Sequence, residues 1–347
     1  MIVKNEEEVL EQCLNSVKEV CDEIIIVDTG STDTTKEIAA KFTDRIIDFK
    51  WIDDFSAARN FAFSHATMDF ILWLDADDIL LEKDLVKLKK LKEELDLTID
   101  AVSMMYHTSF DNNGNPNFTF RRNRLVKRTN QFRWYGAIHE YLEVGGNIVQ
   151  SDIAVTHKKD MKTNIPSRRN ITIYEKRLKK GEVFTPRDLY YYANELKDHQ
   201  KYRKAIRYYD KFLATKKGWV EDEIKACINK ADCFKSLGEN ENELNSLLQS
   251  LKYDSPRAEF CCRLGNYFFE KGDYDTAIYW YDCAVNNKKT DTGGFQNPDY
   301  WTWYPHLQLC VCYWRLQDLE KSCEHNEKAG EYRPDHPSVL ANRKLFE

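Results

Sequence analysis

The chain has 347 residues, 42% hydrophobic and 31% charged, which is the composition of a globular protein with enough length for two domains. Its net charge of -6 lacks the excess of basic residues that is typical of a nucleic-acid binder. The sequence contains no run of about 18 apolar residues, so we expect no membrane span, and the charged stretch from Lys4 to Glu8 argues against a secretory signal.

The ten cysteines form no C-x-x-C pair and no Cys/His set with zinc-site spacing. Most of them lie beside apolar residues on predicted helices, so we expect buried, reduced thiols that pack as small hydrophobic side chains. Reduced thiols and the lack of a signal together predict a cytoplasmic location.

The first 160 residues alternate between helix and strand patterns. Short apolar runs rich in β-branched residues predict strands, and the amphipathic stretches between them predict helices. In chain order we expect a helix over 6–20, a strand over 23–28, a helix over 34–41, a strand over 45–50, a helix over 55–66, a strand over 70–75, a helix over 82–95 and a strand over 101–107. This order is typical of an α/β domain with a mainly parallel sheet, which binds ligands beyond the carboxyl ends of its strands.

A helical repeat begins at about residue 170. Four segments share small and aromatic residues at equal spacings, and the clearest contains Gly265, Phe268, Ala277, Tyr281 and Ala284. The others contain, in the same order, Ala193, Leu196, Ala205, Tyr209 and Phe212, then Ala231, Phe234, Glu243, Leu247 and Ser250, then Cys310, Tyr313, Ser322, Asn326 and Ala329. The starts are 38, 34 and 45 residues apart, near the unit of about 34 in tetratricopeptide repeats. We predict an all-α tetratricopeptide-like domain, with an irregular helical bundle as the alternative.

An insertion over 290–303, rich in Gly, Asn and aromatic residues, interrupts this period. Its aromatic rings either anchor a partner on the surface of the repeats or cap the core between the third and fourth repeats. We expect the domain boundaries at 1–160 for the α/β domain, 161–185 for a linker helix and 186–347 for the repeats.

Two carboxylates, Asp75 and Asp77, follow the predicted strand over 70–75. Residues i and i+2 of a strand point to one face, and after a buried apolar strand two carboxylates have no packing role. Oxygen ligands of this kind suit Mg²⁺ or Mn²⁺, the ions that hold a diphosphate. A solvated acidic turn is the alternative, but Asp78 and a second acidic strand end at Asp28 favour a metal site.

The segment from Asp28 to Asp33 follows a predicted strand and opens a helix. Asp28 is placed to accept hydrogen bonds from a base N–H or from sugar hydroxyls. Asp33 is either a second ligand-binding residue or an ordinary N-cap of the helix.

Six short motifs occur in one order along the chain. They are Met1-Ile-Val-Lys-Asn-Glu-Glu, Ile26-Val-Asp-Thr-Gly-Ser-Thr-Asp, Ala58-Arg-Asn, Leu74-Asp-Ala-Asp-Asp, Gly136-Ala-Ile-His-Glu and Val155-Thr-His. Each motif is weak alone, but the ordered set resembles the family-2 glycosyltransferases of GT-A fold. The last two motifs are similar to the subgroup in which that domain precedes tetratricopeptide-like repeats, some members of which glycosylate cysteine in bacteriocin-type peptides.

The resemblance implies a role for each matching residue. Val3 and Asn5 would line the nucleotide pocket, Asp28 and Asp33 would lie in the nucleotide-sugar site, and Arg59 would reach the base or diphosphate. Asp75 and Ala76 would contact the nucleotide-sugar, and Asp77 and His157 would bind the metal. A solvated loop histidine is the alternative for His157. Glu140 would be the general base, with His139 orienting it or acting as the base itself. The alternative for Glu140 is a structural partner of Arg133 or Arg124.

One departure concerns the start of the domain. The family usually has a full strand before the Val-Lys-Asn-Glu motif, whereas only Met1, Ile2 and Val3 remain here. Either a shortened strand suffices, or residues upstream of Met1 are missing from this sequence.

The expected activity is therefore metal-dependent, inverting transfer of a sugar from a UDP-sugar, such as UDP-glucose or UDP-N-acetylhexosamine. The expected acceptor is a Cys, Ser or Thr side chain of a peptide or protein, or else a glycan. We expect no nucleic-acid partner, and the repeats would bind the acceptor or a second copy of the chain as a homodimer. The rival interpretation is a catalytically inactive scaffold that uses both domains for binding.

Overall fold

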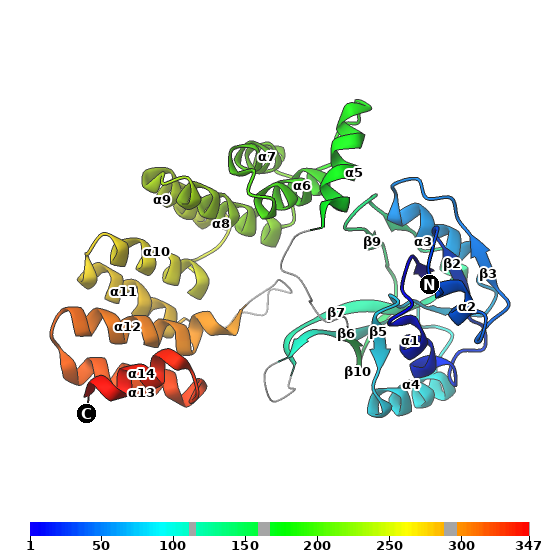
Figure 1. The fold of residues 1–347 in the computed structure, drawn as a ribbon, viewed down its shortest axis with the longest axis horizontal. Coiled ribbons are helices and arrows are strands. Elements are labelled where there is room, and N and C mark those ends of the chain that lie inside the picture. Colours follow the sequence, from blue (N-terminus) through cyan, green and yellow to red (C-terminus); the bar gives the residue numbers. More distant parts are fainter. Residues whose placement is uncertain (111–115, 159–166, 288–296, 347) are drawn as a thin grey trace. The chain divides into compact units, whose positions relative to one another are not determined.

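The computed structural model describes residues 1–110, 116–158, 167–287 and 297–346. The chain divides into two compact units, Met1–Ser167 and Arg168–Glu347. Figure 1 shows that strands belong to the first unit and that the second is built from helices. The predicted combination of an α/β domain and a helical repeat domain is confirmed.

The first unit contains a three-stranded parallel sheet in the order β1-β2-β3. Its strands are β1 (Ile2–Val3), β2 (Ile26–Asp28) and β3 (Ile46–Asp48), and α1 (Leu10–Val17) and α2 (Thr35–Ala39) accompany them. β1 is short but paired, because Val3 aligns with Asp28 of β2. The ammonium group of Met1 donates to the Ile25 carbonyl at 2.8 Å, and burial, aided by the charge of Arg59, lowers its pKa to about 6.

A five-stranded sheet follows, in the order β4-β7-β6-β10-β5. Its strands are β4 (Phe70–Leu72), β5 (Asp78–Leu80), β6 (Ala101–Phe110), β7 (Pro116–Lys127) and β10 (Ile148–His157). β10 and β6 are parallel, whereas the β6–β7, β4–β7 and β10–β5 pairs are antiparallel. The three-stranded sheet therefore has the expected parallel pairing. In the five-stranded sheet most pairs are antiparallel, because consecutive strands such as β6 and β7 lie side by side and run in opposite directions.

Two helices and a small ribbon complete the first unit. They are α3 (Phe55–Ser64), α4 (Glu82–Glu94), and the two-stranded β8 (Trp134–Tyr135) and β9 (Tyr141–Leu142), with a 3-10 turn at Arg128–Asn130. Asp54 caps α3 by accepting from the Ala57 amide at 2.9 Å. The main core joins α1 and α4 to the five-stranded sheet through buried side chains such as Val17, Leu88, Met104 and Val155.

The second unit is a series of antiparallel helix pairs. After α5 (Arg168–Lys179) the pairs are α6 (Pro186–Asp198) with α7 (Tyr202–Thr215), α8 (Val220–Ser236) with α9 (Asn240–Gln249), α10 (Ala258–Glu270) with α11 (Tyr274–Val285), and α12 (Trp303–Arg315) with α13 (Leu319–Tyr332). A 3-10 turn at Ser250–Lys252 follows α9, and α14 (Pro337–Phe346) packs on α13. Each predicted repeat falls on one pair, with its first two positions in the first helix.

Corresponding residues make the same contact in different repeats. The hydroxyl of Tyr209 donates to Asn194 at 2.7 Å, and that of Tyr281 donates to Asn266 at 2.7 Å. Gly265 leaves room for Tyr281, because a Cβ at this glycine would lie 2.5 Å from the ring. The small residues at the first repeat position thus allow an aromatic ring to pack between the helices of a pair.

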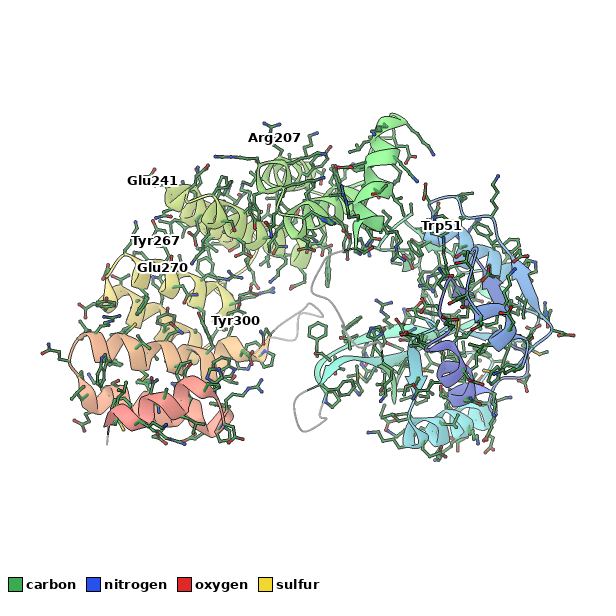
Figure 2. All side chains as sticks on the ribbon, in the orientation of Figure 1. Trp51, Arg207, Glu241, Tyr267, Glu270 and Tyr300 are labelled. Atoms are coloured by element: carbon green, nitrogen blue, oxygen red, sulfur yellow. The ribbon has the colours of Figure 1, made fainter. Side chains whose placement is uncertain are left out.

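Part of the aromatic insertion lies outside the described residues, at 288–296. The part that follows forms a 3-10 turn at Pro298–Trp301 and the start of α12. Tyr300, labelled in Figure 2, packs with Trp301 and Tyr304 on the core of the third repeat, and the Tyr304 hydroxyl donates to Asn266 at 2.9 Å. These rings therefore act as a cap between repeats rather than as an exposed anchor.

All ten cysteines are free thiols, and seven of them are buried. Within the described ranges no helix combines the length and apolar character needed to cross a bilayer.

Candidate active site

The predicted acidic pair lies in a turn and not on a strand. β4 ends at Leu72, and the Asp78 amide donates to the Asp75 carbonyl at 3.1 Å, which closes a turn before β5 begins. The Asp75 amide in turn donates to the Asp78 carboxylate at 2.9 Å. The strand predicted over 70–75 is thus too long, because the acidic residues satisfy the backbone of their own turn.

Asp77, Asp78 and His157 form a cluster in which one ligand atom from each residue lies within 4.8 Å of the others. His157 ends β10, directly opposite Asp78 in the antiparallel pairing with β5. Its Nδ1 lies 3.5 Å from an Asp77 oxygen and 3.9 Å from the Asp78 Oδ1. These two carboxylates raise the pKa of His157 to about 9.

The cluster fits a divalent cation. The Asp78 Oδ1 is buried and accepts no hydrogen bond from the described residues, although a buried carboxylate oxygen normally has a partner. The two carboxylates are the ligand type that Mg²⁺ and Mn²⁺ prefer, and the imidazole is a ligand of first-row transition metals. A cation there would have to displace the proton of His157, because a histidine ligand is neutral.

Arg59 of α3 connects two more predicted site residues. Its guanidinium contacts the Asp75 carboxylate at 2.7 Å and the Glu140 carboxylate at 2.7 Å. The same group lies 4.7 Å from the centre of the Trp134 ring, a cation–π distance. Burial opposes the ionisation of Asp75, but the charges of Arg59 and Arg124 hold its pKa well below the ordinary value.

The segment Gly136–Glu140 carries Glu140 to Arg59. The Phe55 amide at the start of α3 donates to the Ala137 carbonyl at 2.9 Å, and buried Ile138 anchors the segment. His139 follows with a φ of 51°, a left-handed conformation that turns the chain just before Glu140. Glu140 is thus paired with Arg59, whereas Arg124 is paired with Asp78 at 2.9 Å.

Asp28 is the last residue of β2, and its two carboxylate oxygens differ in their hydrogen bonding. Oδ1 accepts from the Gly30 amide at 2.8 Å and the Ser31 amide at 2.9 Å. Oδ2 is buried and has no hydrogen-bond partner in the described part of the chain. Gly30 has a φ of 106°, which a side chain would strain, so the glycine lets both amides turn toward Asp28.

Asn5 and Asp33 brace the loops around Asp28. The side-chain Oδ1 of Asn5 accepts from the backbone N–H of Thr32 at 2.8 Å. The backbone N–H of Asn5 donates to the Ser31 hydroxyl at 3.0 Å. One Asp33 oxygen accepts from the Thr35 hydroxyl at 2.6 Å, and the other accepts from the Glu7 amide at 3.3 Å. These side chains are thus already engaged in holding the two loops together.

Val3 and Ala76 are buried in one cluster, together with Leu10 and Leu14 of α1. This packing places the acidic turn beside β1. The structure therefore brings Asp75, Asp77, Arg59, Glu140 and His157 into one region around the acidic turn. It uses Val3, Ala76, Asn5 and Asp33 as packing or bracing residues.

Comparison with known proteins identifies the family of the first unit. The family model for glycosyl transferase family 2 matches residues 1–146, which hold the acidic turn, Arg59 and Glu140. Residues 1–146 are a family 2 glycosyltransferase domain.

Three relatives show the extent of the similarity. The SPbeta prophage-derived glycosyltransferase SunS of Bacillus subtilis (strain 168) is 32% identical over 224 residues, which are 61% of this chain and 52% of that protein. The TPR repeat-containing protein Synpcc7942_0270 of Synechococcus elongatus is 52% identical over 81 residues, 23% of this chain and 20% of that protein. The solved structure of YrrB, described as a TPR protein with an unusual peptide-binding site, is 18% identical with a TM-score of 0.39, covering 51% of this chain and 83% of its own. The chain spans about half the length of SunS and a fifth of the cyanobacterial protein.

The sequence motifs assign no site role to Asp78, Arg124 or Tyr106. Asp78 was visible as the third acidic residue of its motif, but Arg124 and Tyr106 come from β7 and β6, far away in the sequence. Arg124 is completely buried, and its guanidinium lies 4.0 Å from the Trp73 ring centre and 4.5 Å from that of Tyr106. Arg122 and Arg124 are two residues apart in one strand, so both side chains lie on one face of the sheet. This spacing is the feature of the sequence that could indicate a role for them.

Proposed function

We propose that the protein transfers a sugar from a UDP-sugar to an acceptor with inversion at the anomeric carbon, with help from a divalent cation. The observation that carries the proposal is the cluster of Asp77, Asp78 and His157 beside the Arg59–Asp75 ion pair, within a family 2 glycosyltransferase domain. A bound Mg²⁺ or Mn²⁺ would supply positive charge to the leaving diphosphate.

Each remaining residue then has a defined task. Asp28 accepts a hydrogen bond from the base or ribose through Oδ2, for which the described residues offer no partner. Asp75 is held ionised by Arg59 and faces the nucleotide-sugar. Glu140 removes the proton of the acceptor nucleophile as it attacks, and His139 orients it. Because Glu140 shares Arg59 with Asp75, both carboxylates are kept in a fixed relation to each other.

For the acceptor we propose a polypeptide side chain, Cys or Ser/Thr, held by the helix pairs of the second unit. Stacked helix pairs form extended surfaces that suit a polypeptide better than a small molecule. A second copy of the chain bound through the repeats is the competing use of that surface, and a glycan is the competing acceptor.

The test is incubation of the purified chain with a panel of UDP-sugars and Mn²⁺, scoring UDP release without an acceptor. Slow release from one donor, UDP-glucose or a UDP-N-acetylhexosamine, supports the proposal and names the sugar. No release from any donor, together with retained UDP binding, would favour the inactive scaffold.

The role of the repeats is tested by deleting the chain after Lys179 and assaying both half-reactions. Retained UDP-sugar hydrolysis with loss of acceptor modification supports acceptor binding by the repeats. Modification of the acceptor with an unchanged KM would contradict it.

A further inference from the structure

Arg122 of β7 is a charged residue without a role in the proposed reaction. Its guanidinium lies 5.1 Å from the ring centre of Tyr106, 5.3 Å from that of Phe120 and 5.8 Å from that of Trp73. The residue is half-buried beside these rings, and this burial lowers the pKa of Arg122. Aromatic faces stabilise a guanidinium only in part, because they replace little of its lost hydration.

The neighbouring charges already have partners. Arg59 contacts Asp75 and Glu140, Arg124 contacts Asp78, and His157 lies beside Asp77. Among the residues that the structure describes, no carboxylate lies within 4.0 Å of Arg122. A guanidinium that has lost part of its hydration without gaining an anion is unfavourable unless a ligand brings one.

The position of Arg122 points to the same site. It shares the Tyr106 ring with Arg124, and the Tyr106 hydroxyl lies 3.3 Å from the His157 Nδ1. One aromatic side chain therefore separates Arg122 from the candidate metal cluster. The charge of Arg122 also acts on Asp75, where it favours the ionised carboxylate.

We propose that Arg122 binds the diphosphate of the nucleotide-sugar and stabilises it as it leaves. This inference rests on the proposed function and adds a second cationic group to the metal cluster. The planar guanidinium fork matches two phosphate oxygens, and charge-assisted hydrogen bonds of this type are strong. The diphosphate gains negative charge as the bond to the sugar breaks, so a fixed cation helps the transition state more than the bound donor.

The experiment measures binding of UDP, UMP and uridine by calorimetry in the presence of Mn²⁺, for the full chain and three variants. The variants are Arg122→Met, Arg122→Lys and the control Arg121→Met. Arg121 is adjacent but exposed, and it donates to the Ser151 carbonyl at 2.9 Å.

Arg122→Met is expected to weaken UDP binding roughly ten- to hundredfold, the range for a lost hydrogen bond to a charged group, and to leave uridine binding unchanged. Arg122→Lys keeps a charge of similar reach and should recover part of the loss. Arg121→Met should bind all three ligands as the wild type does.

Equal weakening of UDP and uridine by Arg122→Met would overturn the inference, because it would make Arg122 a structural residue. Unchanged UDP binding by Arg122→Met would also overturn it, because the diphosphate would then not need this guanidinium. If the wild-type chain binds no UDP at all, the proposed function itself fails, which is distinguishable from failure of the Arg122 inference alone.

Discussion

The guanidinium of Arg124 lies 2.9 Å from the carboxylate of Asp78, and both side chains are completely excluded from solvent. Asp78 belongs to the acidic turn, and Arg124 belongs to β7, far along the sequence from that turn. The same Asp78 carboxylate accepts from the Asp75 amide, so this ion pair fixes the shape of the turn. The geometry of the candidate metal cluster thus depends on a pair inside the core.

Replacing Arg124 by Met should therefore destabilise the first unit. The change leaves a buried carboxylate without its counter-charge, which costs about 3–5 kcal/mol in typical proteins. Urea denaturation gives the free energy of unfolding. Lys89→Met is the matched control, because it breaks the exposed pair with Glu19, for which we expect a much smaller loss of stability. An equal decrease in the free energy of unfolding for the two variants would contradict the claim that the buried pair stabilises the fold more than the exposed one.

His157 should make the stability of the metal-free protein depend on pH. Its pKa is raised to about 9 by Asp77 and Asp78, above the ordinary value of 6.5. The charged imidazole therefore stabilises the fold fully below about pH 6.5, and this contribution is lost as the pH rises to about 9. The difference in unfolding free energy between wild type and His157→Gln should shrink over this window, in buffers containing a chelator. A constant difference from pH 6 to pH 10 would refute the ion pair.

The proton on His157 should also make the affinity for a metal ion depend on pH. Because a cation must displace the proton from His157, Mn²⁺ binding should strengthen from pH 6 to about pH 9. In His157→Gln most of this pH dependence should disappear. Isothermal titration with Mn²⁺ at several pH values measures it.

Asp28 should contribute to nucleotide binding through Oδ2, which accepts no hydrogen bond within the part of the chain that the structure describes. Asp28→Asn removes the charge and changes the acceptor at this position, so UDP should bind more weakly by about 1–3 kcal/mol. Asp33→Asn is the control, because both Asp33 oxygens already accept bonds from the Thr35 and Glu7 segments. Unchanged affinity in Asp28→Asn would return Asp28 to a turn-forming role.

The sequence predicted the repeat domain in detail, because its signal is local. Small residues such as Ala193 and Gly265, with aromatic residues such as Tyr209 and Tyr281 at fixed spacing, identify helix pairs without any long-range information. The predicted repeat positions lie within the observed pairs or the turn that follows them.

The first unit was predicted less completely. Most of its predicted helices and strands exist but are shorter, and β7 and β10 were not predicted, because polar residues such as Arg121, Arg122 and Asn123 hide the strand pattern of β7. The contact between Arg59 and Glu140 joins residues 81 positions apart, and no local pattern can reveal such a pairing. The sequence motifs identify the residues of the candidate site, but only the folded structure shows which of them contact each other.

A test of the repeats follows from Gly265. Gly265→Ala should destabilise the third helix pair, because the new Cβ would lie 2.5 Å from the Tyr281 ring. We expect a loss of about 1–3 kcal/mol, typical of overpacking in a core. Gly265→Ala combined with Tyr281→Phe would keep the clash, whereas combination with Tyr281→Leu should relieve it. Unfolding curves that do not change in Gly265→Ala would show that the ring can move aside.

The most direct test of the account is sugar-nucleotide turnover by wild type and Asp77→Asn, with Mn²⁺ and with excess chelator. Asp77 contributes to the cluster of Asp78 and His157 but is less buried than Asp78, so its conservative replacement should leave the fold intact. We expect UDP release by wild type with Mn²⁺, and none by the variant or by wild type in the chelator. Full turnover by Asp77→Asn, or by wild type without metal, would contradict a metal-assisted transfer at this site.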